Sequence, residues 1–307
     1  MTRFIIVRLL QTFVALIGIS ILIFVLVRAS GDPALLFITP LSTEEDLARI
    51  RADLGLDKPM PEQYWIFIKD LAHGDLGDSI VKRRPVTDMI LERLPNTLSL
   101  ALSSFLVSML LAFFLGILAA TRRDTFLDNG VKFLAILGQA LPGFWVAIMA
   151  ILVFSVYWQI FPASGTGDFS HFVLPVATMA FFLMPGMLRL VRSSMLDVLD
   201  SEYIKMARIK GLPERVVIWK HALRNALIAP LTTAGMIFAM LITGAVITEN
   251  VFAWPGIGRL SIEALVSRDF PVVQGVTLMV AVAVLLINLL VDILYAYVDP
   301  QIRYQQM

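Results

Sequence analysis

The sequence contains no cysteine, only three histidines and few charged residues, and each shortage excludes a class of function. Without cysteine the chain can form neither disulfides, nor thiolate metal sites, nor a cysteine nucleophile. His73, His171 and His221 are far apart in the chain, so no short metal-ligand spacing is present and we expect no metal site. Charged residues are 16% of the 307 residues, too few to cover the surface of a soluble protein of this length.

Several motifs of catalytic chemistry are also missing. The chain has no Gly-Lys pair, and therefore no phosphate-binding loop of the Gly-x-x-x-x-Gly-Lys-Ser/Thr kind. It has neither a Gly-x-Ser-x-Gly elbow nor a His-Glu-x-x-His pair. A net charge of +1 gives no reason to expect nucleic acid as a partner. We therefore expect no enzymatic activity, and no ATP or Mg²⁺ bound by this chain itself.

Hydrophobic residues are abundant instead, at 58% of the chain, and the mean hydropathy is +0.81. Six uncharged runs of 19 to 35 residues are long enough for membrane-spanning helices. The third is too long for one span, and the turn formers between Phe161 and Gly167 predict that its helix stops near Trp158. The first run is too long for a signal-peptide core, so it is interpreted as a retained helix. The runs lie between Arg8 and Arg28, Arg93 and Arg122, Lys132 and Asp168, Asp168 and Arg189, Arg224 and Glu249, and Asp269 and Asp292.

The sequence thus predicts an all-α membrane protein with six transmembrane helices. With a cytoplasmic N-terminus, 14 of the 25 lysines and arginines lie on the cytoplasmic side, and only Arg259 and Arg268 lie in the short outer connections. Positive residues favour the cytoplasmic side of a bacterial membrane. The other nine lie in the 66-residue segment from Arg28 to Arg93, which is too long to count in this rule. Both termini are therefore predicted to be cytoplasmic.

The predicted organisation has five parts. The acid-rich part after the first span forms an extracytoplasmic subdomain, either a lid over the helices or a docking surface for a soluble partner. It contains a helix that Ser42 caps and Gly55 closes. The parts are 1–30 (N-terminal tail and first span), 31–93 (extracytoplasmic subdomain), 94–188 (second to fourth spans), 189–226 (cytoplasmic segment) and 227–307 (fifth span, outer loop, sixth span and tail).

The cytoplasmic segment is too long for a simple connection between helices. Asp200 or Ser201 can cap a helix that ends at Lys210, Gly211 fits the position after it, and Pro213 fits the start of a second helix. Two interpretations remain open. The segment is either an interfacial helix held on lipid phosphates by its basic residues, or a projecting helix that docks on a cytoplasmic partner.

Two further groups are candidates for a translocation pathway. On the fifth span, Met and Thr side chains at spacings of three and four share one stripe, which suits either varied cargo or ordinary packing. The outer segment that follows Glu249 combines aromatic residues with helix breakers, which suits membrane-interface anchoring, a re-entrant element or a gate. The pathway candidates are Thr232, Thr233, Met236, Met240, Thr243 and Glu249; the outer loop or gate candidates are Trp254, Pro255, Gly256 and Gly258.

Short motifs in a fixed order resemble those of the inner-membrane permease subunits of bacterial peptide and nickel ABC importers, of the dipeptide, oligopeptide and glutathione type. The resemblance extends over essentially the whole chain. The matching segments are Arg8–Gln11, Gly31–Ala34, Leu54–Asp57, Gly74–Gly77, Arg93–Thr97, Ala207–Gly211, His221–Asn225, Trp254–Gly258, Asp292–Ala296 and Asp299–Pro300.

This resemblance implies a type I ABC importer permease fold that moves peptides by alternating access. It implies a helix that couples the permease to an ATPase, formed by Glu202, Tyr203, Lys205, Ala207, Arg208 and Gly211. The chain departs from the broader Glu-Ala-Ala motif, which here is Lys205, Met206 and Ala207, so Glu202 is not assigned the role of the motif glutamate. The implied partners are a paralogous permease in a heterodimer, two ATP-binding subunits, a solute-binding protein and the lipid bilayer. Two kinds of alternative remain open. The cargo is instead glutathione or a nickel chelate, or the chain is instead a self-contained secondary transporter or channel.

Overall fold

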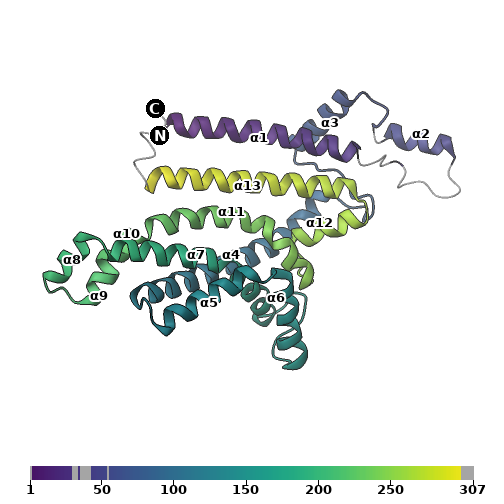
Figure 1. Cartoon of the computed structure of the whole chain (residues 1–307). Helices are drawn as coiled ribbons and strands as arrows, with labels where there is room; N and C mark the ends of the chain where they lie inside the picture. The colour runs from purple at the N-terminus through teal and green to yellow at the C-terminus, as the bar shows by residue number, and fades with distance from the viewer. Residues whose placement is uncertain (1, 30–33, 35–42, 54, 299–307) are drawn as a thin grey trace. The chain divides into compact units, whose positions relative to one another are not determined.

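A computed structural model describes residues 2–29, 34, 43–53 and 55–298. Within these ranges, the side chains of residues 2–5, 53, 239–240, 242–244 and 292–298 are not described. The described part of the chain is helical, with one isolated bridge between Asp78 and Pro85 and no strand (Figure 1). The chain divides into two compact units, Met1–Pro95 with Gly256–Met307, and Asn96–Pro255.

The predicted spans each correspond to one helix or helix pair. Four helices are long and apolar enough to cross a membrane, and a bent pair makes a fifth candidate. The fifth run lies in α11 (Ile228–Val251), whose described apolar part is Ile228–Phe238. The four long helices are α1 (Thr2–Ala29), α4 (Val86–Thr121), α7 (Phe169–Leu199) and α13 (Phe270–Val298).

The third run differs from the single helix that the sequence predicted. It is divided between α5 (Phe126–Ala140) and α6 (Gly143–Ala150), which continues as a π-helix, η2 (Ile151–Tyr157). The two parts meet at a bend of 104°. Pro142 causes the break, because its ring removes a backbone donor and forces the preceding Leu141 into an extended conformation with ψ of 132°. The predicted end near Trp158 is confirmed.

In the first unit, α1 and α13 pack along each other, and α12 (Ile257–Val266) packs on α13 (Figure 1). The polar stretch after α1 contains α2 (Glu44–Asp53) and α3 (Met60–Ala72). Tyr64 of α3 shares a hydrogen bond of 2.9 Å with Ser20 of α1. At α2, Thr43 supplies the capping hydroxyl, whereas the predicted cap Ser42 lies outside the described residues. Gly55 follows with φ of +65°, as predicted for a helix end.

In the second unit, α7 is the central helix. It contacts α5, α6, α11 and α10 (Leu223–Ala226). Two glycines allow neighbouring backbones to approach α7 closely: a Cβ at Gly138 would lie 2.5 Å from Pro185 Cγ, and one at Gly116 would lie 2.8 Å from Val191 Cγ1. This close packing of small residues is typical of helix interfaces within membranes.

Candidate functional site

The segment after α7 contains the residues that the sequence predicted to couple the chain to a partner. Helix α7 itself continues to Leu199, so the first third of the predicted 189–226 part is an extension of that helix. A short helix, α8 (Glu202–Ile209), then begins at Ser201. Ser201 occupies the predicted N-cap position, but its hydroxyl donates to Val198 O instead of capping α8. The chain returns through α9 (Glu214–Val216), the π-helix η3 (Val217–Ala222) and α10 (Figure 1).

One face of α8 is packed against the rest of the unit. Ile204 and Ala207 are buried in the same apolar cluster as Leu199, Val217 and Ala222. The sequence interpretation had Ala207 facing a partner; here its side chain is only 8% exposed and faces this cluster. Alanine at this position keeps the side chain small, which permits close contact between α8 and its neighbours. Ala207 therefore positions α8 within its unit, and a contact of Ala207 with a partner stays a prediction.

The opposite face of α8 is exposed. Tyr203, Met206 and Ile209 recur every three residues and are 44%, 55% and 78% exposed. The Tyr203 hydroxyl also accepts a hydrogen bond of 2.8 Å from Asn225 Nδ2. The coupling residues predicted from the sequence did not include Met206 or Ile209. The spacing of Ile204 and Ala207 puts those two residues on one face of α8, which leaves Met206 and Ile209 on the other face. A short helix with a large exposed apolar stripe is a typical protein contact surface.

The end of α8 is a tight elbow. Gly211 has φ of +75°, and its N–H donates to Arg208 O at 2.9 Å, which confirms the predicted left-handed position after the helix. Pro213 then precedes α9. Across the elbow, Arg208 donates to both oxygens of Glu214, at 2.8 and 3.3 Å. This hydrogen bond lowers the pKa of Glu214. Lys205, in contrast, pairs with Glu202 on the exposed side of α8 at 2.7 Å.

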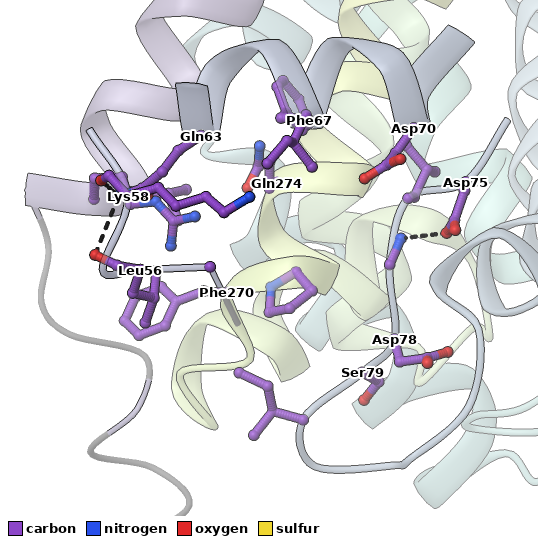
Figure 2. Close-up of a pocket in the computed structure, with 18 of the residues that line it drawn as sticks. Leu56, Lys58, Gln63, Phe67, Asp70, Asp75, Asp78, Ser79, Phe270 and Gln274 are labelled. Carbon is purple, nitrogen blue, oxygen red and sulfur yellow. Dashed lines mark hydrogen bonds between the residues drawn. The ribbon is translucent and has the colours of Figure 1, made fainter. Parts of the chain in front are cut away.

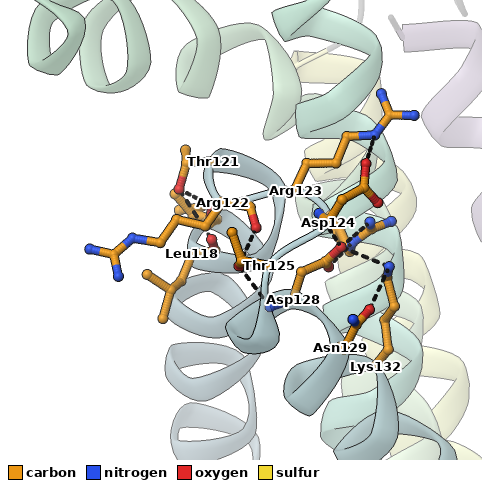
Figure 3. A network of polar contacts seen from close by, with 11 residues as sticks. Leu118, Thr121, Arg122, Arg123, Asp124, Thr125, Asp128, Asn129 and Lys132 are labelled. Atoms are coloured by element: carbon orange, nitrogen blue, oxygen red, sulfur yellow. Dashed lines mark hydrogen bonds and ion pairs between the residues drawn. The ribbon is translucent and has the colours of Figure 1, made fainter.

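A buried polar cluster that was not predicted from the sequence fixes the start of α5 to α7. The fully buried carboxylate of Asp128 accepts two hydrogen bonds from Arg192, at 2.7 and 2.9 Å, and one from Asp124 N at 3.1 Å. Lys132 Nζ lies 2.7 Å from the same carboxylate (Figure 3). A bidentate arginine pair of this kind restricts the orientation of both helices. The pairing joins residues 64 positions apart, so no local pattern in the sequence indicates it.

Of the predicted pathway residues on α11, only some have described side chains. Thr232 and Thr233 both donate to the carbonyl of Ala229, and Met236 is exposed. The side chains of Met240 and Thr243 lie outside the described residues. Met236 is thus not part of the packed core of its unit, but the complete stripe and its role in a pathway remain a prediction.

The segment that follows Glu249 is held to α4 by hydrogen bonds. The Thr97 hydroxyl donates to the buried carboxylate of Glu249 at 2.7 Å. Trp254 is fully buried, donates to Asn96 O at 3.0 Å and contacts the ring of Phe172 edge-on. Asn96 in turn donates to Pro255 O at 3.0 Å. Because Trp254 is covered by protein, it does not act as a lipid-facing aromatic anchor. Gly256 occupies the N-cap position of α12, and Gly258 is buried in its first turn.

The class of protein follows from the fold. The structure is similar to a chain of the MetNI methionine ABC transporter in an inward-facing conformation, with a TM-score of 0.59 and 17% identity over 69% of this chain and 96% of that chain. It is also similar to a chain of an amino acid ABC transporter, with a TM-score of 0.55 and 15% identity over 69% and 94%. The architecture is therefore the type I importer permease fold, an all-α membrane domain.

Sequence comparisons extend this result to the whole chain. Residues 112–304 match the family described as binding-protein-dependent transport system inner membrane component, and residues 1–101 match the N-terminal model of the same systems. The chain is 42% identical, over 99% of its length and 100% of the relative, to a putative peptide transport system permease protein of Brucella abortus (strain 2308). It is 39% identical to the oligopeptide permease AppB of Bacillus subtilis (strain 168), over 99% and 100%. The glutathione permease GsiC of Escherichia coli O6:H1 (strain CFT073) is 38% identical, over 99% and 100%.

The chain therefore belongs to the family of binding-protein-dependent transport system inner membrane components. It is a multi-pass inner-membrane permease subunit, and members of this class are not the catalytic part of their transporters.

Proposed function

We propose that this permease moves short peptides inward across the bacterial inner membrane, driven by ATP hydrolysis in separate subunits. The observation that carries the proposal is full-length similarity of about 40% to permeases whose names specify peptide and oligopeptide transport. Glutathione, itself a modified tripeptide, is the second candidate, because a glutathione permease is nearly as similar. A nickel chelate is a third candidate, inferred only from short motifs.

The proposed partners are three kinds of protein subunit and the lipid bilayer. A paralogous permease completes the translocation pathway, since the six helices of this chain form only half of it. Two ATP-binding subunits bind ATP and Mg²⁺, and a solute-binding protein delivers the cargo. The resemblance of the motifs supports this set. The exposed apolar side chains of α1 are consistent with contact with lipid or with the second permease.

We propose that both termini are cytoplasmic, which puts α2 and α3 outside the cell membrane and α8 inside. The 14 to 2 distribution of basic residues supports this orientation. Single cysteines at Asp57 and Lys210 provide a test, because the natural chain has no cysteine. An impermeant thiol reagent applied to intact spheroplasts is expected to label position 57 and not position 210. Labelling of both positions would overturn the orientation.

The proposed coupling uses α8 as a rigid contact on an ATPase subunit. Its exposed stripe of Tyr203, Met206 and Ile209 supplies the apolar contact, and the elbow at Gly211 fixes its direction. ATP can bias the transporter between inward-open and outward-open states only if this contact differs between those states. In that scheme the packed face of α8, at Ile204 and Ala207, passes movement to α7 and its neighbours.

Substitutions on α8 test this coupling against the lipid-anchor alternative. Ile209→Glu adds a charge to an exposed apolar contact and is expected to weaken binding of the ATPase about tenfold or more. Gly211→Val disfavours the left-handed conformation and tilts the helix. Cargo-stimulated ATP hydrolysis and peptide uptake should fall together in both variants. Gly165→Val is the matched control, because Gly165 also has a positive φ, of +84°, and no atom lies within 4 Å of the position of its Cβ.

The two interpretations of α8 predict different rankings. If lipid phosphates hold the helix, charge reversal at Lys205, Arg208 and Lys210 should reduce uptake more than Ile209→Glu, and the ATPase should still copurify with all variants. Unchanged uptake by both Ile209→Glu and Gly211→Val would rule out the coupling role.

A further inference from the structure

A cavity of about 900 Å³ lies in the first unit, between the end of α1, α3, the loop after α3 and the start of α13 (Figure 2). This volume is within the range of pockets that hold small ligands, about 300–1,000 Å³. The lining combines aromatic, amide and charged side chains. Phe67 and Phe270 supply the aromatic surface, and Gln63 and Gln274 supply the amides.

The walls of this cavity are held by side chains that do not line it. Asp269, which is buried at the start of α13, accepts hydrogen bonds from the Ser79 hydroxyl, from Ile80 N at 3.1 Å and from Val81 N at 3.4 Å. At the other end of the same loop, Thr87 donates to Gly74 O at 2.9 Å. The loop is thus fixed to α13 and α4 before any ligand binds, which reduces the entropy that binding would cost.

The lining residue Gln63 has a polar atom that is shielded from solvent and has no hydrogen-bond partner in the described part of the chain. The side chain of Gln63 is more than nine-tenths buried, and its Nε2 donates to Leu56 O at 3.2 Å and to Lys58 O at 2.8 Å. Its Oε1 accepts no hydrogen bond. A buried acceptor without a partner costs free energy, which is commonly a sign of a functional position.

Charged side chains of both signs line the cavity. Figure 2 shows Lys58 on one side and Asp70, Asp75 and Asp78 on the other, with Gln274 and Phe270 between them. Arg28 and Arg83 also line the cavity. Lys58 pairs with Glu62 at 3.1 Å, but both are about half exposed, and such pairs contribute about 0–1 kcal/mol and exchange readily. Among the described residues no three acidic or histidine side chains are close enough to hold a metal ion.

We propose that this cavity binds a short peptide by both of its ends. The aspartates bind the terminal ammonium, Lys58 binds the terminal carboxylate, and Phe67 and Phe270 contact the side chains between them. A peptide with free termini is a zwitterion, and charge-assisted hydrogen bonds to both ends select it over a capped chain. The inference rests on the proposed function, in which the cargo is a peptide and α2 and α3 lie outside the membrane, on the side where the solute-binding protein delivers cargo. The cavity is then a receiving site between that protein and the membrane pathway.

The test measures direct binding of a tripeptide to the complete transporter in nanodiscs of phosphatidylcholine and phosphatidylglycerol, without the solute-binding protein. Asp70→Asn with Asp78→Asn is expected to weaken binding about tenfold, and Lys58→Gln by a similar factor. These carboxylates make no hydrogen bond or ion pair within the described residues, so their replacement spares the fold. Asp57→Asn and Lys69→Gln are matched controls, because both residues are exposed and neither lines the cavity.

Capped peptides identify which end each side binds. N-acetylation should weaken binding to the wild type about tenfold and add little in the double aspartate variant, whereas C-terminal amidation should add little in Lys58→Gln. Equal losses from capping in all variants would overturn the proposal. Two other results would also overturn it. One is that the transporter binds no peptide directly and the aspartate and Lys58 variants only weaken docking of the solute-binding protein, measured separately; the other is that phosphatidylethanolamine displaces the ligand whereas peptides do not. Peptide uptake by the wild type is measured in parallel: if uptake is absent while binding follows the expected pattern, the proposed function fails and the site stands.

Discussion

Helices α7 and α1 are both long and apolar enough to cross a membrane, but they are packed very differently. In the most apolar part of α7, 56% of residues are buried inside the chain, compared with 22% in α1. Helix α7 contacts helices on several sides, whereas α1 packs mainly along α13. Apolar composition therefore indicates which helices enter the membrane, but not which of them form the core of the subunit.

Small residues and buried polar pairs make the difference. Gly116 and Gly138 let α4 and α5 approach α7, and Arg192 of α7 pairs with Asp128 of α5. Along α1, large apolar side chains remain exposed and need lipid or another subunit to cover them. They are Ile6, Val7, Leu9, Leu10, Phe13, Val14, Ile17, Ile21, Leu22, Val25 and Leu26.

The largest expected effect comes from enlarging a glycine beside α7. A Cβ at Gly138 would lie 2.5 Å from Pro185 Cγ and 2.8 Å from Phe181 O, so Gly138→Leu must separate α5 from α7. We expect a loss of about 3 kcal/mol or more, or no folded protein. Gly18→Leu on α1 is the control, because nothing lies within 4 Å of its Cβ position. Thermal unfolding of the chain purified alone in detergent measures both. Equal losses from the two substitutions would remove the distinction between the helices.

A similar loss is expected from breaking the buried pair. Arg192→Met leaves the carboxylate of Asp128 buried with Lys132 alone, and removing one partner of a buried pair costs about 3–5 kcal/mol. Adding Asp128→Leu should recover much of this loss, because an apolar pair replaces the uncompensated charge. The comparison in the first unit is Glu62→Gln, which breaks the exposed pair with Lys58 and should cost under about 1 kcal/mol. A double variant no more stable than Arg192→Met would show that the pair does more than neutralise charge.

The spans and the α8 elbow could be predicted because their signals are local. Uncharged runs, the turn formers after Trp158, and the glycine and proline at 211 and 213 all act within a few residues. The same local reasoning missed the bend at Pro142, since the length of the third run was explained by its far end alone.

Contacts between distant residues could not be predicted in this way. The burial of Ala207 depends on η3, and the burial of Trp254 depends on Asn96, 158 positions earlier in the chain. The cavity at Gln63 needs the loop after α3 and the start of α13 to meet, nearly 200 positions apart. Periodicity gives the face of a helix but not the neighbour of that face.

The smallest expected effect concerns how far the stability of the α7 core extends into the elbow after α8. Arg208 holds the pKa of Glu214 below its ordinary value, so the stabilisation from this pair is fully present above that ordinary value and is lost as the pH falls through the lowered pKa. Both side chains are about half exposed, so Glu214→Gln should cost under about 1 kcal/mol near neutral pH. Hydrogen exchange at the α8 amides should be faster in Glu214→Gln at about pH 7 and match the wild type once Glu214 is protonated. In an Arg208→Met background the same substitution should have no effect. A difference that persists in that background, or is unchanged in acid, would show that the effect of Glu214 does not come from its ion pair with Arg208.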